Sequence, residues 1–336
     1  MTARRGGAAA VIALLIVLGA TPAGAHTTGG PPASNFRTEL TGVRPPSRGV
    51  EVSLAPDHEQ LELRVNGPHI VTVIGYQGEP YLRVDAQGVS ENERSPAVAA
   101  NRTRIPTGSP GRTTGTPTWR RVSHRPIARW HDHRAHWMGG ITPSAVRRDP
   151  DHEHVVVRWS IPVRVDGRPA QIGGQIRWAP PPPAWPWWVA AVILAGAMVI
   201  VAARPRIARA GLAAALVLMA GAEALHLWGG WPFSTSSTLG RLGDAIPSIA
   251  AIGACLAALA WLLRSTAWRC APALILAGIF VFVSGGVADL SSLSHAFVPS
   301  RVSPDVARAL IALALGLGGG TTIAGGLRLR APRPSS

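Results

Sequence analysis

The sequence contains no lysine and only two cysteines, and these shortages already exclude some kinds of structure. All 33 basic residues are arginine. Both cysteines, Cys255 and Cys270, lie in the second half of the chain, so the first half cannot be a disulfide-stapled domain and must rely on its core. The sequence also lacks a P-loop, a G-x-S-x-G elbow and the HExxH, CxxC and CxxCH motifs. With no nucleophile–base pairing in sight, we do not expect an enzyme.

The formal net charge of +15 would by itself suggest an anionic partner such as nucleic acid. Its distribution argues against that interpretation. Residues 26–185 carry 20 arginines against 14 acidic residues, a modest excess of 6. The rest of the excess lies mostly in short loops between apolar runs. We therefore expect no nucleic-acid partner.

Residues 1–25 have the composition of a signal peptide. Arg4 and Arg5 precede a short apolar run, Ala8–Ala20, and an A-x-A site follows at Ala23–Ala25. The apolar run is short for a membrane span, although an uncleaved anchor is the alternative. Cleavage after Ala25 would leave His26 as the first residue of the mature chain.

Residues 26–184 are expected to form one extracytoplasmic all-β sandwich, like an immunoglobulin or cupredoxin domain. Short runs with period-two alternation are separated by Gly, Pro, Asn and Asp, which is typical of antiparallel strands. A segment rich in Pro and Gly, Ser95–Pro117, reads as a long loop. The alternating runs are 50–54, 61–65, 69–75, 81–85, 154–161 and 170–178.

Residues 185–328 are expected to form a transmembrane bundle, and residues 329–336 a cytoplasmic tail. Trp185, Trp187 and Trp188 mark an interfacial aromatic belt at the start of the bundle. Each apolar segment is close to the roughly 20 residues that a bilayer requires. The five predicted spans lie near 187–203, 207–228, 246–263, 271–287 and 306–327.

The arginines between these spans predict the topology. If the first domain is outside, eight arginines lie on the inner side and only Arg241, Arg301 and Arg308 on the outer side. This asymmetry follows the positive-inside rule. We therefore expect a multi-pass protein of the cell membrane with a cytoplasmic C-terminus.

The densest group of reactive side chains is the segment Trp130–Met138, which contains His131, His133 and His136. If the segment is extended, His131 and His133 point to one face, as two ligands of one metal ion would. Imidazole suits copper and zinc among other metals. The alternative is a tryptophan-anchored corner in which His, Asp and Arg satisfy one another by hydrogen bonds.

His26 adds to the metal hypothesis if cleavage frees its amino group. The α-amino group and the imidazole of one residue can chelate Cu(II) together, and a further imidazole would complete a three-nitrogen site of the histidine-brace type. Such nitrogen donors favour copper over zinc. Equally, His26 can be the first residue of a tail with no ligand role.

Four further residues predict a relay at the outer end of the bundle. Glu223 and His226 are three positions apart, hence on one helix face, and Asp289 and His295 follow near the end of the fourth span. Ionisable groups within the bilayer are costly and are often functional. We expect this group to pass a metal ion or a proton, with plain interfacial solvation as the alternative.

Several motifs resemble those of an uncharacterised family of exported multi-pass membrane proteins from high-GC Gram-positive bacteria. They are the run Gly75–Val84 (GYQGEPYLRV), residues 88–92 and 95–96, the segment Trp130–Met138 (WHDHRAHWM) and residues 178–181. The layout is also similar to bacterial copper-resistance systems, which pair an exported β-sandwich bearing an N-terminal His with a helical membrane partner. This chain differs from them in lacking an intramembrane histidine pair.

Two functions follow from these observations. The first is an envelope protein whose β domain binds a transition metal, copper before zinc, for trafficking or homeostasis. The second is a membrane-anchored scaffold that docks a protein or cell-wall partner and whose histidines are structural. In both cases the lipid bilayer is the surrounding medium.

Overall fold

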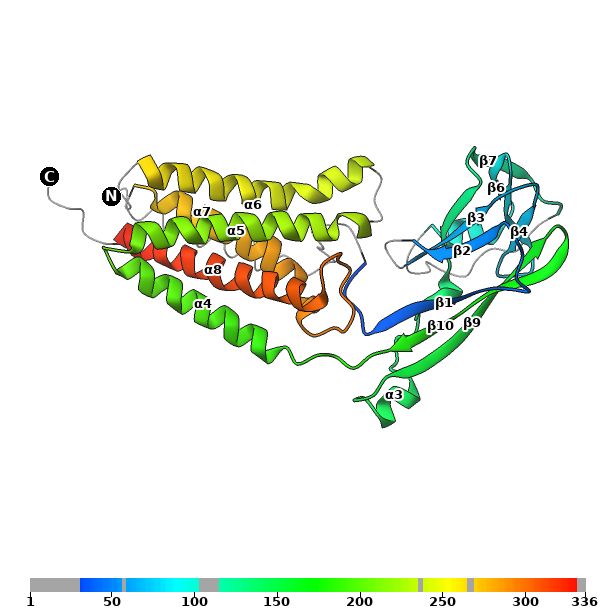
Figure 1. The fold of residues 1–336 in the computed structure, drawn as a ribbon, viewed down its shortest axis with the longest axis horizontal. Coiled ribbons are helices and arrows are strands. Elements are labelled where there is room, and N and C mark those ends of the chain that lie inside the picture. Colours follow the sequence, from blue (N-terminus) through cyan, green and yellow to red (C-terminus); the bar gives the residue numbers. More distant parts are fainter. Residues whose placement is uncertain (1–30, 56–58, 103–114, 235–237, 265–268, 331–336) are drawn as a thin grey trace.

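The computed structural model describes residues 31–55, 59–102, 115–234, 238–264 and 269–330. Figure 1 shows two parts in sequence order, a β domain and a bundle of long helices that extends away from it. All strand pairs in the β domain are antiparallel.

The β domain contains ten strands in two sheets. The larger sheet has the order β1-β10-β9-β4-β5-β6-β7 and the smaller one β2-β3-β8. Leu61 and Leu63 of the smaller sheet share one core with Val73, Val84 and Ile161 of the larger one. The strands are β1 (Phe36–Arg44), β2 (Val50–Leu54), β3 (Gln60–Val65), β4 (Val71–Ile74), β5 (Pro80–Asp85), β6 (Gly88–Asn92), β7 (Trp119–Ser123), β8 (Ile127–His131), β9 (His154–Val165) and β10 (Arg168–Trp178).

Alternation and turn chemistry explain the longest hairpin, β9–β10. Along β9, Trp159, Ile161 and Val163 are buried while the residues between them are exposed. Asp166 and Gly167, at the turn, have φ values of 51° and 79°, the left-handed pair that a two-residue turn needs. The predicted strand runs are therefore confirmed, although the two strands of this hairpin are longer than expected.

Two short helices and one turn interrupt the strands. The expected loop at Ser95–Pro117 begins with α2 (Pro96–Ala100), and most of the remaining loop lies outside the described residues. A 3₁₀ turn at His133–Ala135 follows β8, and α3 (Ser144–Arg148) precedes β9. The histidine segment is therefore not extended throughout, because the strand ends at His131.

The predicted spans are confirmed as five helices that are long and apolar enough to cross a membrane. These helices fit a multi-pass membrane protein. The spans are α4 (Trp185–Ala203), α5 (Ala208–Gly230), α6 (Thr238–Arg264), α7 (Ala271–Val281) and α8 (Pro304–Arg330). After α7, a π-helical turn (Phe282–Gly286) and a 3₁₀ segment (Val287–Leu293) prolong the fourth span.

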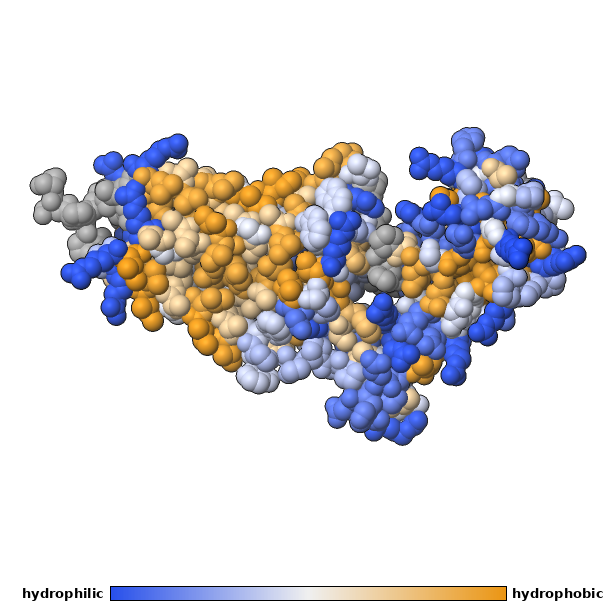
Figure 2. All heavy atoms as spheres, in the orientation of Figure 1, coloured by the Kyte–Doolittle hydropathy of each residue, from blue (hydrophilic) through white to orange (hydrophobic). Residues whose placement is uncertain are grey.

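The surface of the bundle is apolar along its length and charged at the end opposite the β domain. Figure 2 shows this apolar band and the hydrophilic residues that close it on that far side. The arginines there include Arg204 and Arg206 between α4 and α5. This is the distribution of a lipid-exposed bundle with polar ends.

Small residues allow α8 to pack closely against α4 and α7, as the glycine pattern predicts. A Cβ on Gly316 would lie 2.7 Å from the carbonyl oxygen of Ala191 in α4. A Cβ on Gly318 would lie 2.9 Å from the carbonyl oxygen of Gly278 in α7. Helix α8 is accordingly the central helix, with buried residues from Ala307 to Gly325.

The β domain also contacts the bundle directly. Ser34, just before β1, exchanges two backbone hydrogen bonds with Phe297 in the loop before α8, at 3.0 and 2.8 Å. The side chain of Asn35 accepts a hydrogen bond from the backbone of Ala296 at 2.7 Å. The start of the β domain is thus paired with a loop of the bundle.

Arg308 holds that loop in place. Its side chain is 5 % exposed, and its guanidinium donates to the carbonyl oxygens of Ser292 at 3.1 Å and His295 at 2.9 Å. It also pairs with Asp305 at 2.8 Å. Arg308, one of the three arginines predicted on the outer side, therefore fixes the backbone of residues 292–295.

Candidate functional site

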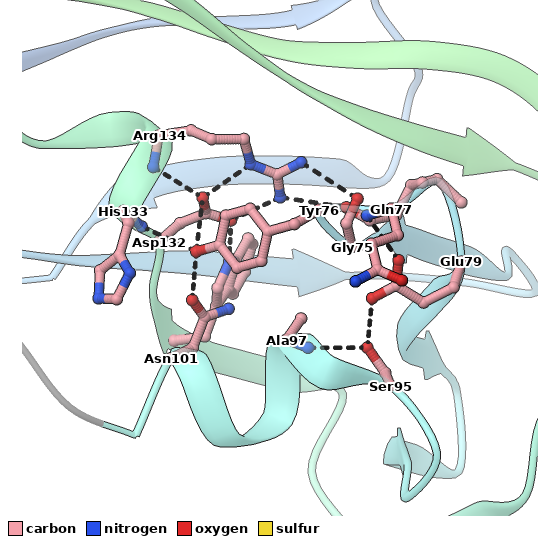
Figure 3. Close-up of polar contacts among 12 residues, drawn as sticks. Gly75, Tyr76, Gln77, Glu79, Ser95, Ala97, Asn101, Asp132, His133 and Arg134 are labelled. Atoms are coloured by element: carbon pink, nitrogen blue, oxygen red, sulfur yellow. Dashed lines mark hydrogen bonds and ion pairs between the residues drawn. The ribbon is translucent and has the colours of Figure 1, made fainter. Parts of the chain in front are cut away.

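The two sequence motifs of the β domain meet around one buried carboxylate, Asp132 (Figure 3). Asp132 is 0 % exposed. It accepts hydrogen bonds from the indole of Trp130 at 3.1 Å and from the Arg134 backbone at 3.1 Å. The Arg134 guanidinium adds two more, both at 2.8 Å. This charge-assisted fork satisfies both carboxylate oxygens.

Tyr76 joins the GYQGEPYLRV motif to this network. Its hydroxyl donates to the Asn101 side chain and accepts from the backbone N–H of His133 at 3.0 Å. The Arg134 guanidinium lies 4.7 Å from the centre of the Tyr76 ring and donates to the carbonyl oxygen of Ile74 at 3.1 Å. Burial and the nearby Asp132 charge raise the pKa of Tyr76, so the hydroxyl stays protonated as a donor.

A second buried carboxylate, Glu79, fixes the turn of the same motif. It accepts from the backbone N–H of Gln77 at 2.8 Å and from the Ser95 hydroxyl at 2.7 Å. Ser95 in turn caps α2 by accepting from Ala97 at 3.2 Å. Burial raises the pKa of the neighbouring Tyr81 to about 12. These contacts make the motif residues structural, as the tryptophan-anchored-corner interpretation predicts for Trp130, Asp132 and Arg134.

The three histidines of the segment lie close together around that corner. The rings of His131 and His136 are stacked, with centroids 4.3 Å apart and planes 5° from parallel. His133 meets His131 edge-on at 5.0 Å. The nitrogen lone pairs of an imidazole lie in the plane of its ring, so stacked parallel rings do not converge on one ion in this arrangement. Among the described residues, no group of three or more His, Cys, Asp or Glu side chains is arranged to hold a metal ion.

A hydrogen bond orients His136. Its Nε2 lies 2.6 Å from the carbonyl oxygen of Glu59, and a carbonyl oxygen can only accept. Nε2 therefore carries the hydrogen, and in the neutral ring the lone pair is on Nδ1. A backbone carbonyl that fixes the tautomer in this way is common behind metal-ligating histidines.

His131 and His136 line a cavity of about 600 Å³ between the β domain and the bundle, which we call the interface cavity. Its volume falls in the range of small-molecule and cofactor sites. Pro31 and Phe36 line it from the start of the β domain, and Phe297 and Val302 from the bundle loop. His133 does not line this cavity, so the pair that shares it is His131 with His136.

The intramembrane residues form a second polar group. His226 of α5 lies 3.1 Å from Asp289 of the 3₁₀ segment, nitrogen to oxygen, and their side chains are 16 % and 14 % exposed. Glu223, one turn deeper on α5, is 1 % exposed. Its carboxylate contacts the Ser284 hydroxyl at 2.9 Å. The structure thus brings together three of the four predicted relay residues.

The fourth relay residue, His295, turns away from this group. Its Nδ1 lies 2.6 Å from the carbonyl oxygen of Ser291, four residues earlier, and its own carbonyl oxygen accepts from Arg308. It therefore belongs to the clamped loop. His26, the remaining predicted ligand, lies outside the described residues.

A second, smaller cavity of about 30 Å³, here called the bundle cavity, lies beside His226 and Asp289. This volume is enough for one water molecule. It is bounded by residues that also line the interface cavity: Pro31, Val298, Pro299, Ser300 and Val302. One wall therefore separates the cavity of the histidines from the intramembrane ion pair.

Local sequence patterns did not indicate the long-range contacts of three residues. Tyr76 and Asn101 contact Asp132 or its neighbours across many residues of chain, and Ser284 reaches Glu223 across 61 positions. The glycine pair at 285 and 286 does indicate a close approach by another group at this point of the fourth span. In the structure that group is the Glu223 carboxylate, since a Cβ on Gly285 would lie 2.3 Å from one of its oxygens. Comparison with known proteins adds no relative, since no family model, curated protein or solved structure matches this chain.

Proposed function

We propose that this chain is an envelope membrane protein that binds a transition metal, copper before zinc, in the interface cavity. The ligands would be His131, His136 and the mature N-terminus at His26. The observation that carries the proposal is that the first described residue, Pro31, lines the cavity that contains both histidines.

Chain length makes His26 a reachable ligand. Five positions separate it from Pro31, and an extended chain of that length spans about 17 Å. Once the signal peptide is removed, the α-amino group and the imidazole of His26 supply two nitrogens. The Nδ1 lone pair of His136 or a nitrogen of His131 supplies the third, a set that favours Cu(II).

The stacked rings require one adjustment. One imidazole must rotate out of the stack to direct its nitrogen toward an ion that the other also binds. His136 is held by Glu59, so His131 is the ring expected to move. Metal binding would then break the stack, which is a measurable change in the environment of the neighbouring Trp130 and Trp137.

The proposal includes an orientation and a domain type. The arginine-rich end of the bundle lies opposite the β domain, which supports a β domain outside the cell membrane and a cytoplasmic C-terminus. The two sheets with one core support an immunoglobulin- or cupredoxin-like domain. Release of the signal peptide after Ala25 is part of the same proposal.

The test is a titration of the full-length mature protein in detergent with Cu(II) and with Zn(II), followed by isothermal calorimetry. We expect one tight Cu(II) site that His131→Ala and His136→Ala each weaken. The matched control is His152→Ala, whose side chain is 77 % exposed and does not line the cavity. Insertion of one alanine before His26 tests the amino-terminal ligand. In that variant the free α-amino group belongs to the alanine, so it can no longer chelate the ion together with the imidazole of the same residue.

Equal Cu(II) uptake by the wild type and both cavity variants would reject the metal proposal. The second candidate, a scaffold that docks a protein or wall polymer, would then stand. It is favoured by one observation: four polar residues of the two motifs, Tyr76, Glu79, Asp132 and Arg134, are engaged in the hydrogen-bond network of Figure 3.

A further inference from the structure

The carboxyl group of Glu223 is the least satisfied buried acid of the bundle. It lies on the bare backbone of Gly285 in the π-helical turn, and π-helical turns are frequent at functional sites. Its Oε2 makes no hydrogen bond of ordinary geometry. Ser248 of α6 makes a weak hydrogen-bonding interaction with the carboxyl group, and its hydroxyl likewise has no hydrogen bond of ordinary geometry.

The two contacts of the Ser284 hydroxyl bear on the protonation state of this acid, because one hydroxyl hydrogen cannot serve both. Its oxygen lies 2.9 Å from Glu223 Oε1 and 2.7 Å from the carbonyl oxygen of Phe280. A serine hydroxyl has one hydrogen and two lone pairs. If that hydrogen goes to Phe280, the usual back-bond of a helical serine, then Glu223 must supply the hydrogen of the other contact. A protonated Glu223 satisfies both short contacts, and an ionised one does not.

The charges around Glu223 favour the same state. The groups that act on it are His226 on its own helix, Asp289 and Ser284 from the fourth span, and Ser248 and Cys255 from α6. From helix α8, the apolar Ala314 lies beside Gly285, at the point where the Glu223 carboxyl group also lies. Within this described set only His226 can be cationic, and it is already paired with Asp289 at 3.1 Å. An ionised Glu223 would leave one uncompensated negative charge in an apolar bundle, which is costly.

We propose that Glu223 is a proton-binding site inside the membrane, and that its proton exchanges with the β-domain side through His226, Asp289 and the bundle cavity. The cavity has room for about one water molecule at the ion pair and shares its wall with the interface cavity. A proton would pass between Glu223 and that water by way of the ion pair. This inference goes beyond metal binding and does not depend on it, since it concerns the metal-free protein.

Infrared spectroscopy of the full-length, metal-free protein tests the proposal. At neutral pH the exposed carboxyl groups are ionised, so a protonated buried acid gives its own carbonyl band, which shifts in D₂O. We expect that band in the wild type and its loss in Glu223→Gln, which keeps the shape and one hydrogen-bond donor. The matched control is Asp305→Asn, an acid 81 % exposed that should leave the band unchanged. A wild type without the band, or a band that persists in Glu223→Gln, would overturn the proposal.

Two further variants test the hydrogen bond and the route, and they also serve if Glu223→Gln fails to fold. Ser284→Ala removes the acceptor and should move the band to higher frequency; an unmoved band would contradict the Ser284 contact. Ala307→Leu fills the bundle cavity, which Ala307 lines. It should slow deuterium uptake by the band several-fold while leaving its frequency in place. Unchanged uptake would reject the route through that cavity.

Discussion

Asp132 and Glu223 are both fully buried carboxyl groups, yet their surroundings differ completely. Asp132 is 0 % exposed and receives two backbone or indole hydrogen bonds together with a guanidinium fork. Glu223 is 1 % exposed and has one hydroxyl contact of normal geometry. A satisfied buried network makes the local structure rigid, whereas an incompletely satisfied group is a sign of function. The comparison indicates a structural role for Asp132 and its partners, and it singles out Glu223 as the buried carboxyl group whose surroundings are not those of a structural acid.

The largest effect should come from removing the partner of Asp132. Arg134→Met leaves a buried carboxylate without its cation, which costs about 3–5 kcal/mol when a buried pair is broken. We expect a large loss in the thermal stability of the full-length protein, followed by near-UV circular dichroism of the tryptophans. The matched control is Arg129→Met. The Arg129 side chain is 57 % exposed, and its pair with Glu62 at 2.6 Å should contribute about 1 kcal/mol or less. Equal losses in the two variants would contradict the structural role of the network.

A smaller effect should follow from Tyr76→Phe. The substitution keeps the ring beneath Arg134 but removes the hydroxyl that serves Asn101 and the His133 backbone. Leaving buried polar groups without a partner costs about 1–3 kcal/mol. Thermal melts at equal protein concentration measure the loss. A Tyr76→Phe protein as stable as the wild type would show that this hydroxyl is dispensable to the corner.

Glu223→Gln should change stability by less than about 1 kcal/mol, because an amide replaces a neutral acid of the same shape. Thermal stability of the full-length protein in detergent is the measurement. The expected loss of stability is therefore several-fold smaller than that of Arg134→Met. A loss of stability as large as that of Arg134→Met would mean that the Glu223 carboxyl group has a structural role in the bundle rather than a proton-binding one.

The smallest effect on stability is expected at the exposed pair of His69 and Asp166, which belongs to neither the Asp132 nor the Glu223 group. The Ile70 backbone N–H, followed by His69, holds the pKa of Asp166 below its ordinary value of 3.8. The pKa is lower in the folded state, so the stabilisation is present above the unfolded value and is lost as pH falls through the folded value. Asp166→Asn should therefore lower the melting temperature slightly at neutral pH and have less effect in strong acid. A pH-independent difference would contradict this linkage.

Hydrophobic patterns predicted most of the fold because burial is a local, periodic signal. The five spans and the alternating strands were readable for that reason. Strands β1, β6, β7 and β8 were not among the predicted runs. In β1 the register shifts between Leu40 and Gly42, which interrupts the period of two. The third span, α6, begins at Thr238, eight residues before the predicted start at 246. The helix continues on the N-terminal side of Pro247, where its first turns contain polar residues.

The site was less predictable because its contacts are long-range. In the histidine segment the side chains alternate between buried and partly exposed, and Asp132 falls on the buried side. Its polarity would have predicted a surface position. Burial is possible because Arg134, in the 3₁₀ turn that follows, pairs with its carboxylate. Whether His131 faces His133 or His136 depends on that turn, which no spacing rule gives. Glu223 and His226 were predictable from helix geometry alone, whereas Ser284 was not.

The pairing of Ser34 with Phe297 has a mechanical consequence. Among the described residues, the β domain joins the bundle through this pair and through residues 179–184 between β10 and α4. Two connections restrict the relative orientation of the two parts more than a single linker would. Arg308 binds the same stretch of chain at Ser292 and His295, and Ser292 is three residues from Asp289. A short, tethered stretch of chain therefore connects the first strand of the β domain to the intramembrane ion pair.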